Sequence, residues 1–279
     1  MPELPEVETI ARNLAKGDEQ TPSVLGQKIV SSSIFWAKTV AEPDLLSFHS
    51  AIKNQSVLNV SRRGKFLIFD LDHAFLLIHL RMSGDLIMRY ADMPLPLSKP
   101  LVPHDHVYLH FADNWHLAFN DTRKFGRVWL TPDPNHILSK LGPEPFDPKL
   151  TDVNFADKLR KHKRQLKPLL LDQSFIAGLG NIYTDEALFE AGLNPRRQSN
   201  SLSFDDSSRL LRAIRKVLQL GIEHNGASID WAYKGGGFQN YFQVYQQTGN
   251  PCPRCGNPIT RTVIGQRGTH FCERCQPLI

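Results

Sequence analysis

Apolar residues change their spacing twice along this chain of 279 residues, and each change marks a different kind of structure. After Pro5 they recur every three or four residues, which predicts a short amphipathic helix near the start of the chain. Short segments of alternating polarity follow, as in strands with one buried face. The predicted strands span residues 55–60, 65–71, 75–80, 86–90, 107–111, 116–119 and 127–130. Their close spacing predicts antiparallel sheets in two layers, a sandwich or barrel.

Prolines concentrated at residues 132–148 separate this strand-rich part from a helical one. Helical spacing of apolar residues returns at 154–162, 167–171, 183–191 and 205–224. The last segment opens with Asp205 and Asp206, whose side chains are good helix caps. We therefore expect domains at 1–133 and 149–240, a linker at 134–148 and a terminal module at 241–279. The proline-rich residues 93–103 and the glycine-rich residues 234–237 are expected to be loops, the second of them mobile.

Charge indicates the class of partner. The net charge of +5 is modest, but six of the eleven residues from Asp157 to Lys167 are basic, and further basic clusters lie at 62–65 and within 251–279. Three clusters favour a polyanion, although any one of them could be an ordinary solvated surface. No apolar run reaches 18 residues, which excludes a transmembrane helix. The acidic, proline-rich start is unlike a secretory signal, so we expect a cytoplasmic protein.

All four cysteines lie near the end of the chain in two Cys-x2-Cys pairs. They are Cys252, Cys255, Cys272 and Cys275. Two such turns can present four thiolates to one tetrahedral zinc ion, as in a zinc ribbon, while two disulfides or free thiols are the alternative. Four protein ligands leave no open position on the metal. The zinc is therefore expected to stiffen a small hairpin and not to activate water.

Residues 2–9, Pro-Glu-Leu-Pro-Glu-Val-Glu-Thr, together with this ribbon resemble the formamidopyrimidine-DNA glycosylase family, bacterial enzymes that remove oxidised purines from DNA. The matching motifs continue at 63–66, 79–84, 120–126, 171–173, 178–183 and 243–245. The resemblance implies an α+β multidomain protein. Its N-terminal antiparallel two-layer β-sandwich would carry a catalytic N-terminal helix, and its C-terminal helix-two-turn-helix domain would carry the zinc ribbon. It further implies one structural Zn²⁺ with no catalytic metal or organic cofactor, and a monomer that binds damaged double-stranded DNA in the bacterial nucleoid.

The family assigns the chemistry to the start of the chain. Removal of Met1 would leave Pro2 with a free secondary amine, and an α-amino group has a pKa low enough to be partly neutral near pH 7. Its attack on the sugar would give a Schiff base that expels the base and permits β,δ-elimination. By resemblance, Glu3 protonates the sugar ring oxygen, Glu6 helps to shape the site, and Lys65 meets phosphates beside the lesion. Without the resemblance, the proline and the two acids are equally suited to starting a helix.

The family also indicates how the duplex is held. A damaged base must leave the helix, and Met82, Arg123 and Phe125 match the residues that fill the gap. Gly178 to Asn181 joins two helical segments, where glycines and a helix N-terminus could approach phosphate. The resemblance places four residues in this phosphate track: Lys167, Asn181, Tyr245 and Arg267. Residues 227–238 correspond to the loop that closes over the flipped base.

Three other functions remain open at this point: a related enzyme class, a nucleic-acid binder without catalysis, and a purely structural zinc-ribbon interaction module, which would leave the N-terminal motif unexplained. The related endonuclease VIII class shares the fold and the proline chemistry but prefers oxidised pyrimidines, and Leu4 with the gap-filling set favours the purine enzyme. A nucleic-acid binder without catalysis would be expected to lack Pro2 or Glu3. The departures from the family pattern are Thr122, Lys124 and an apparent insertion at 93–103, none of which is expected to alter catalysis.

Overall fold

The computed structural model describes residues 1–228, 233 and 235–278, and the chain forms two compact units. The first comprises Met1–Pro2, Glu6–Ser139 and the described residues of Ser228–Lys234, and the second comprises Glu3–Pro5, Lys140–Ala227 and Gly235–Ile279. The chain therefore crosses between units both at its start and within the expected linker. In the part of the chain that is described, no helix has the length and apolarity needed to span a membrane.

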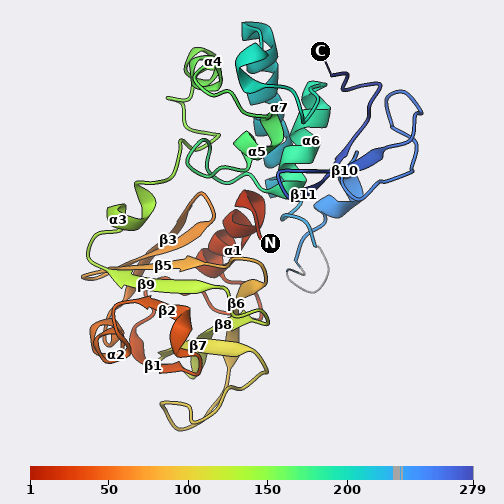
Figure 1. The fold of residues 1–279 in the computed structure, drawn as a ribbon. Coiled ribbons are helices and arrows are strands. Elements are labelled where there is room, and N and C mark those ends of the chain that lie inside the picture. Colours follow the sequence, from red (N-terminus) through yellow and green to blue (C-terminus); the bar gives the residue numbers. More distant parts are fainter. Residues whose placement is uncertain (229–232, 234, 279) are drawn as a thin grey trace. The chain divides into compact units, whose positions relative to one another are not determined.

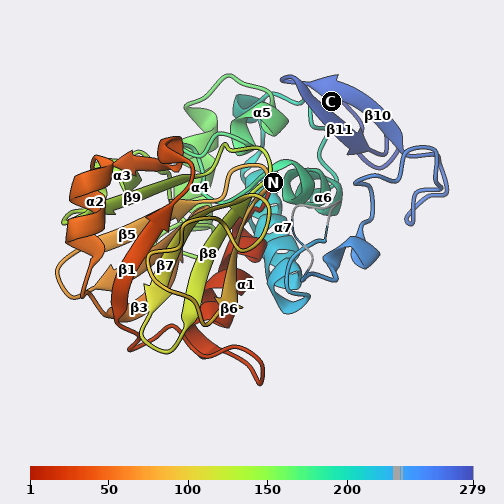
Figure 2. The same cartoon turned by 90° about the horizontal axis from the view of Figure 1, so that it is seen from below.

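The first unit is built on two sheets (Figure 1). One has the strand order β1 (Ile29–Ile34), β7 (Asp105–Phe111), β8 (Trp115–Asp121), β6 (Gly84–Tyr90), and Figure 2 shows it along one side of the unit. The other has the order β2 (Val40–Glu42), β9 (Arg127–Thr131), β5 (Phe75–His79), β4 (Phe66–Leu71), β3 (Val57–Arg63). All seven expected strands are present. Strands β1 and β2 were not predicted, and β2 pairs with β9 in parallel, so the second sheet is not wholly antiparallel.

The core of this unit forms where the apolar faces of the two sheets meet. Phe69 of β4, Phe111 of β7 and Phe119 of β8 are almost completely buried in it. The predicted N-terminal helix is α1 (Leu4–Lys16), whose apolar stripe joins the same cluster. A second helix, α2 (Leu45–Ile52), was not predicted. It begins at Asp44, whose carboxylate accepts the N–H groups of Leu46 and Ser47 and so caps the first turn.

Residues 91–103 lie on the outer side of β7 and β8, held by a chain of buried hydrogen bonds through two histidines. The Leu97 N–H donates to Ser33 Oγ, which lies 2.8 Å from His110 Nε2. The Nδ1 atoms of His110 and His116 are 3.0 Å apart, and His116 Nε2 lies 3.0 Å from the Ala91 carbonyl. A carbonyl only accepts, so each proton in the chain is assigned when both rings are neutral. The apparent insertion is thus fastened to the sheet at two points.

These buried hydrogen bonds through His110 and His116 predict that acid destabilises the fold. Burial, and next the neighbouring His116, lower the pKa of His110 to about 3, below its usual value of 6.5. The native state therefore binds fewer protons than the unfolded state between these values, so its stability is complete above pH 6.5 and is lost as the pH falls toward 3. We expect urea unfolding of His110→Gln, which cannot titrate, to depend less on pH across this window than unfolding of the wild type. Parallel pH profiles for the two proteins would contradict this assignment.

The second unit is helical and ends in a hairpin (Figure 1). Its elements are α4 (Asp152–Arg160), α5 (Leu166–Leu170), α6 (Asn181–Ala191), α7 (Phe204–Glu223), β10 (Thr260–Ile264) and β11 (Arg267–Phe271), while the short α3 (Asn135–Leu138) belongs to the first unit. The four predicted helices are therefore present. The predicted cap of α7 is wrong: Ser203 accepts the Asp206 N–H, and Asp205 and Asp206 lie in the first helical turn. There the two acids face the positive end of the helix dipole.

The glycine-rich segment after α7 is fixed at its C-terminal end, although it was expected to be mobile. Gly237 N–H donates to the His224 carbonyl and Phe238 N–H to the Gly226 carbonyl, both near the end of α7. A side chain at Gly236 would collide with the Gly226 backbone at 2.2 Å. The proposed lesion-capping loop, residues 227–238, falls partly outside the described residues, which here comprise 227, 228, 233 and 235–238.

Candidate functional site

The carboxylate of Glu3 is held at the N-terminus of α6, within the second unit. Its oxygens accept N–H groups from Gly180 at 2.7 Å, Ile182 at 3.0 Å and Tyr183 at 3.4 Å. Glu3 is 2% exposed, and a Cβ on Gly180 would lie 2.3 Å from its carboxyl carbon. Gly180 is therefore required by the close approach of Glu3. The proposal that phosphate uses this helix N-terminus needs correction, because the N–H groups already bind a carboxylate.

The other three candidates for catalysis, Pro2, Glu6 and Lys65, belong to the first unit. Pro2 and Glu6 are buried, and Glu6 lies in the first turn of α1. Lys65 follows Gly64 in the two-residue turn between β3 and β4, where the Gly64 φ of 58° favours glycine. Lys65 is 5% exposed, and its charge is one of the causes that lower the pKa of the nearby His79 to about 3, after burial and Arg81. The turn thus places a buried ammonium beside a neutral imidazole.

The three predicted gap-filling residues lie on two neighbouring loops of the first unit. Met82 is half-buried in the turn between β5 and β6, and Arg123 and Phe125 are exposed in the loop between β8 and β9. The Arg123 guanidinium lies 5.0 Å from the centre of the Phe125 ring. Lys124, one of the departures from the family pattern, lies over the Trp36 ring at 4.3 Å and so anchors this loop to the unit.

Asp121, at the end of β8, fastens these two loops together. Its Oδ1 accepts the Ser83 hydroxyl and the Arg123 N–H, while its Oδ2 accepts the Gly126 N–H at 2.7 Å. Ser83 Oγ in turn accepts the Arg123 N–H at 3.1 Å. Since both Asp121 and Ser83 are buried, the exposed side chains project from a fixed base.

Lys167 does not lie where the sequence analysis expected. Its side chain is fully buried, and its ammonium pairs with Asp185 of α6 and donates to the Gly268 carbonyl at 3.1 Å. It is thus not available for direct phosphate contact. Burial lowers the pKa of Lys167, and the charge of Asp185 opposes this shift. Lys167 instead joins α5 and α6 to β11, the strand that begins with Arg267.

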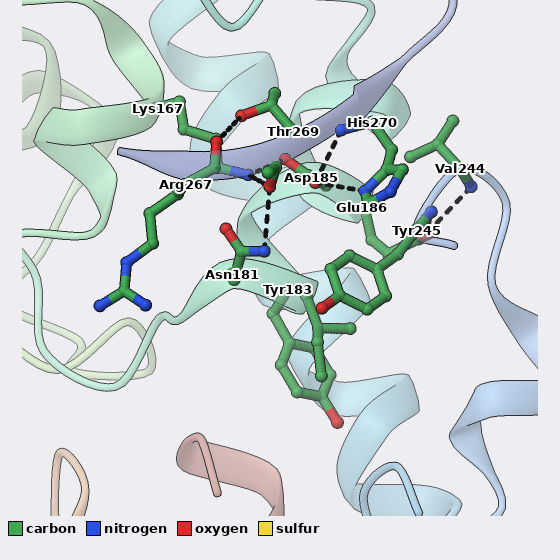
Figure 3. A network of polar contacts seen from close by, with 12 residues as sticks. Lys167, Asn181, Tyr183, Asp185, Glu186, Val244, Tyr245, Arg267, Thr269 and His270 are labelled. Atoms are coloured by element: carbon green, nitrogen blue, oxygen red, sulfur yellow. Dashed lines mark hydrogen bonds and ion pairs between the residues drawn. The ribbon is translucent and has the colours of Figure 1, made fainter. Parts of the chain in front are cut away.

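Asn181, Tyr245 and Arg267 lie along one side of this network (Figure 3). Asn181 Nδ2 donates to the Gly268 carbonyl at 3.0 Å, and the Arg267 side chain is exposed. Tyr245 is half-buried against His270, with ring centres 5.0 Å apart. The three residues predicted to contact phosphate therefore lie close together, although the Asn181 amide is turned toward the Gly268 carbonyl.

Glu186 fixes the segment that carries Tyr245. Its carboxylate accepts three successive backbone N–H groups, from Gln243, Val244 and Tyr245, at 2.8–3.0 Å. Burial raises the pKa of Glu186 to about 7, although the three donors favour the charged form. The two adjacent acids of α6 thus hold two different segments. Glu186 binds the backbone of residues 243–245, and Asp185 binds the hairpin through His270 of β11.

The four cysteines form a compact cluster whose ligand sulphurs all lie within 4.8 Å of one another. The Sγ atoms of Cys252 and Cys275 are 3.8 Å apart, and those of Cys255 and Cys272 are 3.5 Å apart. A tetrahedral ion with bonds of about 2.3 Å separates its sulphur ligands by about 3.8 Å, whereas a disulfide needs about 2.05 Å. The cluster therefore fits one zinc ion and excludes the disulfide alternative. The zinc is structural, since the four thiolates complete its coordination.

Removal of zinc should weaken DNA binding and leave the chemistry at the start of the chain intact. The cluster closes the module that carries β10 and β11, so without metal the hairpin loses the support that orients Arg267. We expect Cys272→Ser to lose zinc and to reduce affinity for duplex DNA by about tenfold or more, in line with the cost of losing a charged contact. Fluorescence anisotropy with parallel zinc analysis measures both effects. Unchanged affinity in a zinc-free protein would refute this role.

Several residues that support the candidate site residues were not predicted from the sequence. They are His79, Ser83 and Asp121 in the first unit and Asp185 and Glu186 in the second. The first three lie inside motifs that were recognised, so their position beside assigned residues was a usable signal. Asp185 and Glu186 sit within a predicted helix and look like ordinary surface acids. Their burial depends on segments about 60 to 85 positions away in the chain.

Three family models match the chain. The formamidopyrimidine-DNA glycosylase N-terminal domain matches residues 1–128, its H2TH domain matches 141–232, and a zinc finger found in FPG and IleRS matches 249–278. A formamidopyrimidine-DNA glycosylase from Protochlamydia amoebophila is 41% identical, with 99% of each chain covered.

Solved structures agree in fold over nearly the whole chain. MutM in complex with DNA containing carbocyclic 8-oxo-G has a TM-score of 0.89 and 37% identity, covering 99% of this chain and 100% of that one. Wild-type Lactococcus lactis Fpg in complex with DNA containing an oxidised pyrimidine has a TM-score of 0.88 and 38% identity, with the same coverage. Both the strand-rich and the helical part are included in these matches.

Proposed function

Because this chain belongs to the formamidopyrimidine-DNA glycosylase family, and is therefore a DNA glycosylase with AP lyase activity and one structural zinc, we propose that it excises oxidised purines from duplex DNA through a Schiff base on Pro2. Its substrates would be 8-oxoguanine and formamidopyrimidines, and its role base excision repair. The observation that carries the proposal is the position of Glu3. Glu3 directly follows Pro2 in the chain, and its buried carboxylate accepts three backbone N–H groups.

The reaction begins with the amine of Pro2, freed by removal of Met1. Its lone pair attacks C1′ of the damaged nucleoside as the bond from C1′ to the base breaks, the base leaves with the proton given up by the amine, and the sugar ring then opens to a cationic iminium. Glu3 supplies the proton to the ring oxygen. The iminium then acts as an electron sink, so that loss of a C2′ proton expels the 3′ phosphate and a second elimination expels the 5′ phosphate. Each proton transfer requires a fixed acid or base, which suits a carboxylate with little freedom to move.

The other residues of the first unit support substrate binding in this proposal. Lys65 neutralises phosphates beside the lesion, where a buried ammonium acts strongly because little water screens it. Glu6 shapes the catalytic centre from the first turn of α1. Met82 and Phe125 fill the space left by the extruded base, and Arg123 donates hydrogen bonds to the orphaned cytosine.

The second unit holds the backbone of the duplex in this proposal. Asn181, Tyr245 and Arg267 bind phosphates, which fixes the position of the enzyme without reading sequence. Zinc supplies no step of the reaction and keeps the hairpin of Arg267 folded.

The second candidate is an endonuclease VIII-like glycosylase for oxidised pyrimidines. The complex of a Lactococcus lactis relative with an oxidised pyrimidine makes this activity worth measuring. The proposal for purines rests on the exposed Arg123 and Phe125, which stand together on a fixed loop as a pair suited to filling the gap opposite cytosine.

Borohydride trapping on a matched set of duplexes tests the proposal. We expect a covalent adduct with 8-oxoguanine opposite cytosine, and weaker trapping with thymine glycol in the same sequence. An undamaged duplex serves as the control. Trapping with thymine glycol and none with any oxidised purine would establish the second candidate instead.

A further inference from the structure

We propose that Asp185 is a positioning residue for Arg267, and that Lys167 acts as its buried counter-charge. This inference rests on the proposed function, because it takes Arg267 to be a phosphate contact. Asp185 itself lies fully buried in α6, and its effect on DNA would pass through the backbone of β11.

The backbone beside Arg267 is fixed at three successive peptide units. Thr269 Oγ1 donates to the Arg267 carbonyl at 3.0 Å, and the Gly268 carbonyl accepts from Lys167 and Asn181. The His270 N–H donates to Asp185 Oδ2 at 2.9 Å (Figure 3). Since each of these bonds restrains rotation of the peptide units around Arg267, its long side chain starts from a defined point on the surface.

The buried charges of the network hold the hairpin in position, and a different charge, that of the exposed Arg267, is available to DNA. Lys167 Nζ pairs with Asp185 Oδ1, while Asp185 Oδ2 accepts the His270 N–H and lies 3.3 Å from His270 Nδ1. Both members of the ion pair have fully buried side chains. A lysine neutralised in this way adds little attraction for phosphate, so the exposed Arg267 supplies the charge that DNA meets.

The neighbouring acid provides an internal comparison. Glu186 is buried in the same helix but accepts N–H groups from residues 243–245, away from the hairpin. Removal of its charge should disturb Tyr245, a neutral residue, and leave the number of phosphates neutralised by arginine unchanged. The two adjacent acids are therefore expected to differ in their effect on salt dependence.

The experiment measures the slope of log affinity against log salt concentration for a duplex containing a tetrahydrofuran abasic analogue. Each phosphate neutralised contributes about 0.9 to this slope. We expect Arg267→Ala and Asp185→Asn each to reduce it by about 0.9, and the double variant to show no further reduction. Glu186→Gln and the surface control Glu19→Gln should keep the wild-type slope. Zinc content is measured for every variant, so that loss of the ribbon is not taken for loss of position.

A second variant distinguishes loss of positioning from misfolding. Asp185→Asn leaves Lys167 charged and unpaired, whereas Lys167→Met with Asp185→Asn removes both charges and still lacks the carboxylate that holds His270. We expect this pair variant to fold, to retain zinc and to show the same reduced slope. A wild-type slope in it, or additive losses when Arg267→Ala is combined with Asp185→Asn, would overturn the proposal. An unchanged slope in Arg267→Ala would overturn it as well. Failure of the proposed function is seen separately, as absence of a borohydride adduct in the wild type.

Discussion

Replacement of Pro2 by glycine is expected to weaken borohydride trapping strongly and to reduce strand cleavage by about 10³-fold, equivalent to about 4 kcal/mol of transition-state stabilisation. A secondary amine gives an iminium with a permanent positive charge, whereas the imine of a primary amine must be protonated before it can act as an electron sink. Trapping on 8-oxoguanine opposite cytosine and gel assays of strand cleavage measure the two effects.

Two controls distinguish the effect of losing the Pro2 amine from the effect of changing α1, the helix that follows it. A fusion that retains Met1 keeps the Pro2 ring but turns its nitrogen into an amide, so it should be as inactive as the glycine variant. Pro5→Ala changes the proline in the first turn of α1 and leaves the amine intact, so trapping should persist. Full trapping by the Met1 fusion would exclude Pro2 as the nucleophile.

Replacement of Glu3 by glutamine is expected to reduce base excision by about 10²–10⁴-fold, the usual range for loss of a general acid or base. The same change should destabilise the second unit by about 1–3 kcal/mol, because a neutral amide accepts the N–H groups of α6 less strongly and brings its own N–H donors toward them. Single-turnover excision and urea unfolding report these two effects independently.

Glu8→Gln is the matched control for Glu3. Glu8 lies in α1, the helix that directly follows Glu3, and it pairs with Arg12 and Arg62 and is more exposed than Glu3. We expect its excision rate to stay close to that of the wild type. If Glu3→Gln lowered stability alone, with excision unchanged at a temperature where the protein is folded, Glu3 would be only a helix cap.

The order of most helices and strands can be predicted from the local pattern of residues, and the motifs of the family are visible in the same pattern. Short runs of apolar and alternating residues predicted seven strands of the first unit, because each of these strands buries at least one face in the core. The spacing of Cys252, Cys255, Cys272 and Cys275 predicted the metal cluster, because two tight turns present ligands in pairs. Strand β1 was not predicted because its run of three serines lacks alternating polarity. Strand β2 was not predicted because it is only three residues long.

The roles of individual charges follow from the folded structure alone. Lys167 looks like a DNA contact within a basic cluster, yet it is buried against Asp185, 18 residues further along. Glu3 looks like a first-turn acid of its own helix, yet it caps α6 at Gly180, 177 residues away. Local patterns reflect interactions between near neighbours, which the order of residues fixes. The partner of a buried charge is chosen by chain folding, and a single sequence carries no local signal of which distant donor or acceptor will reach it.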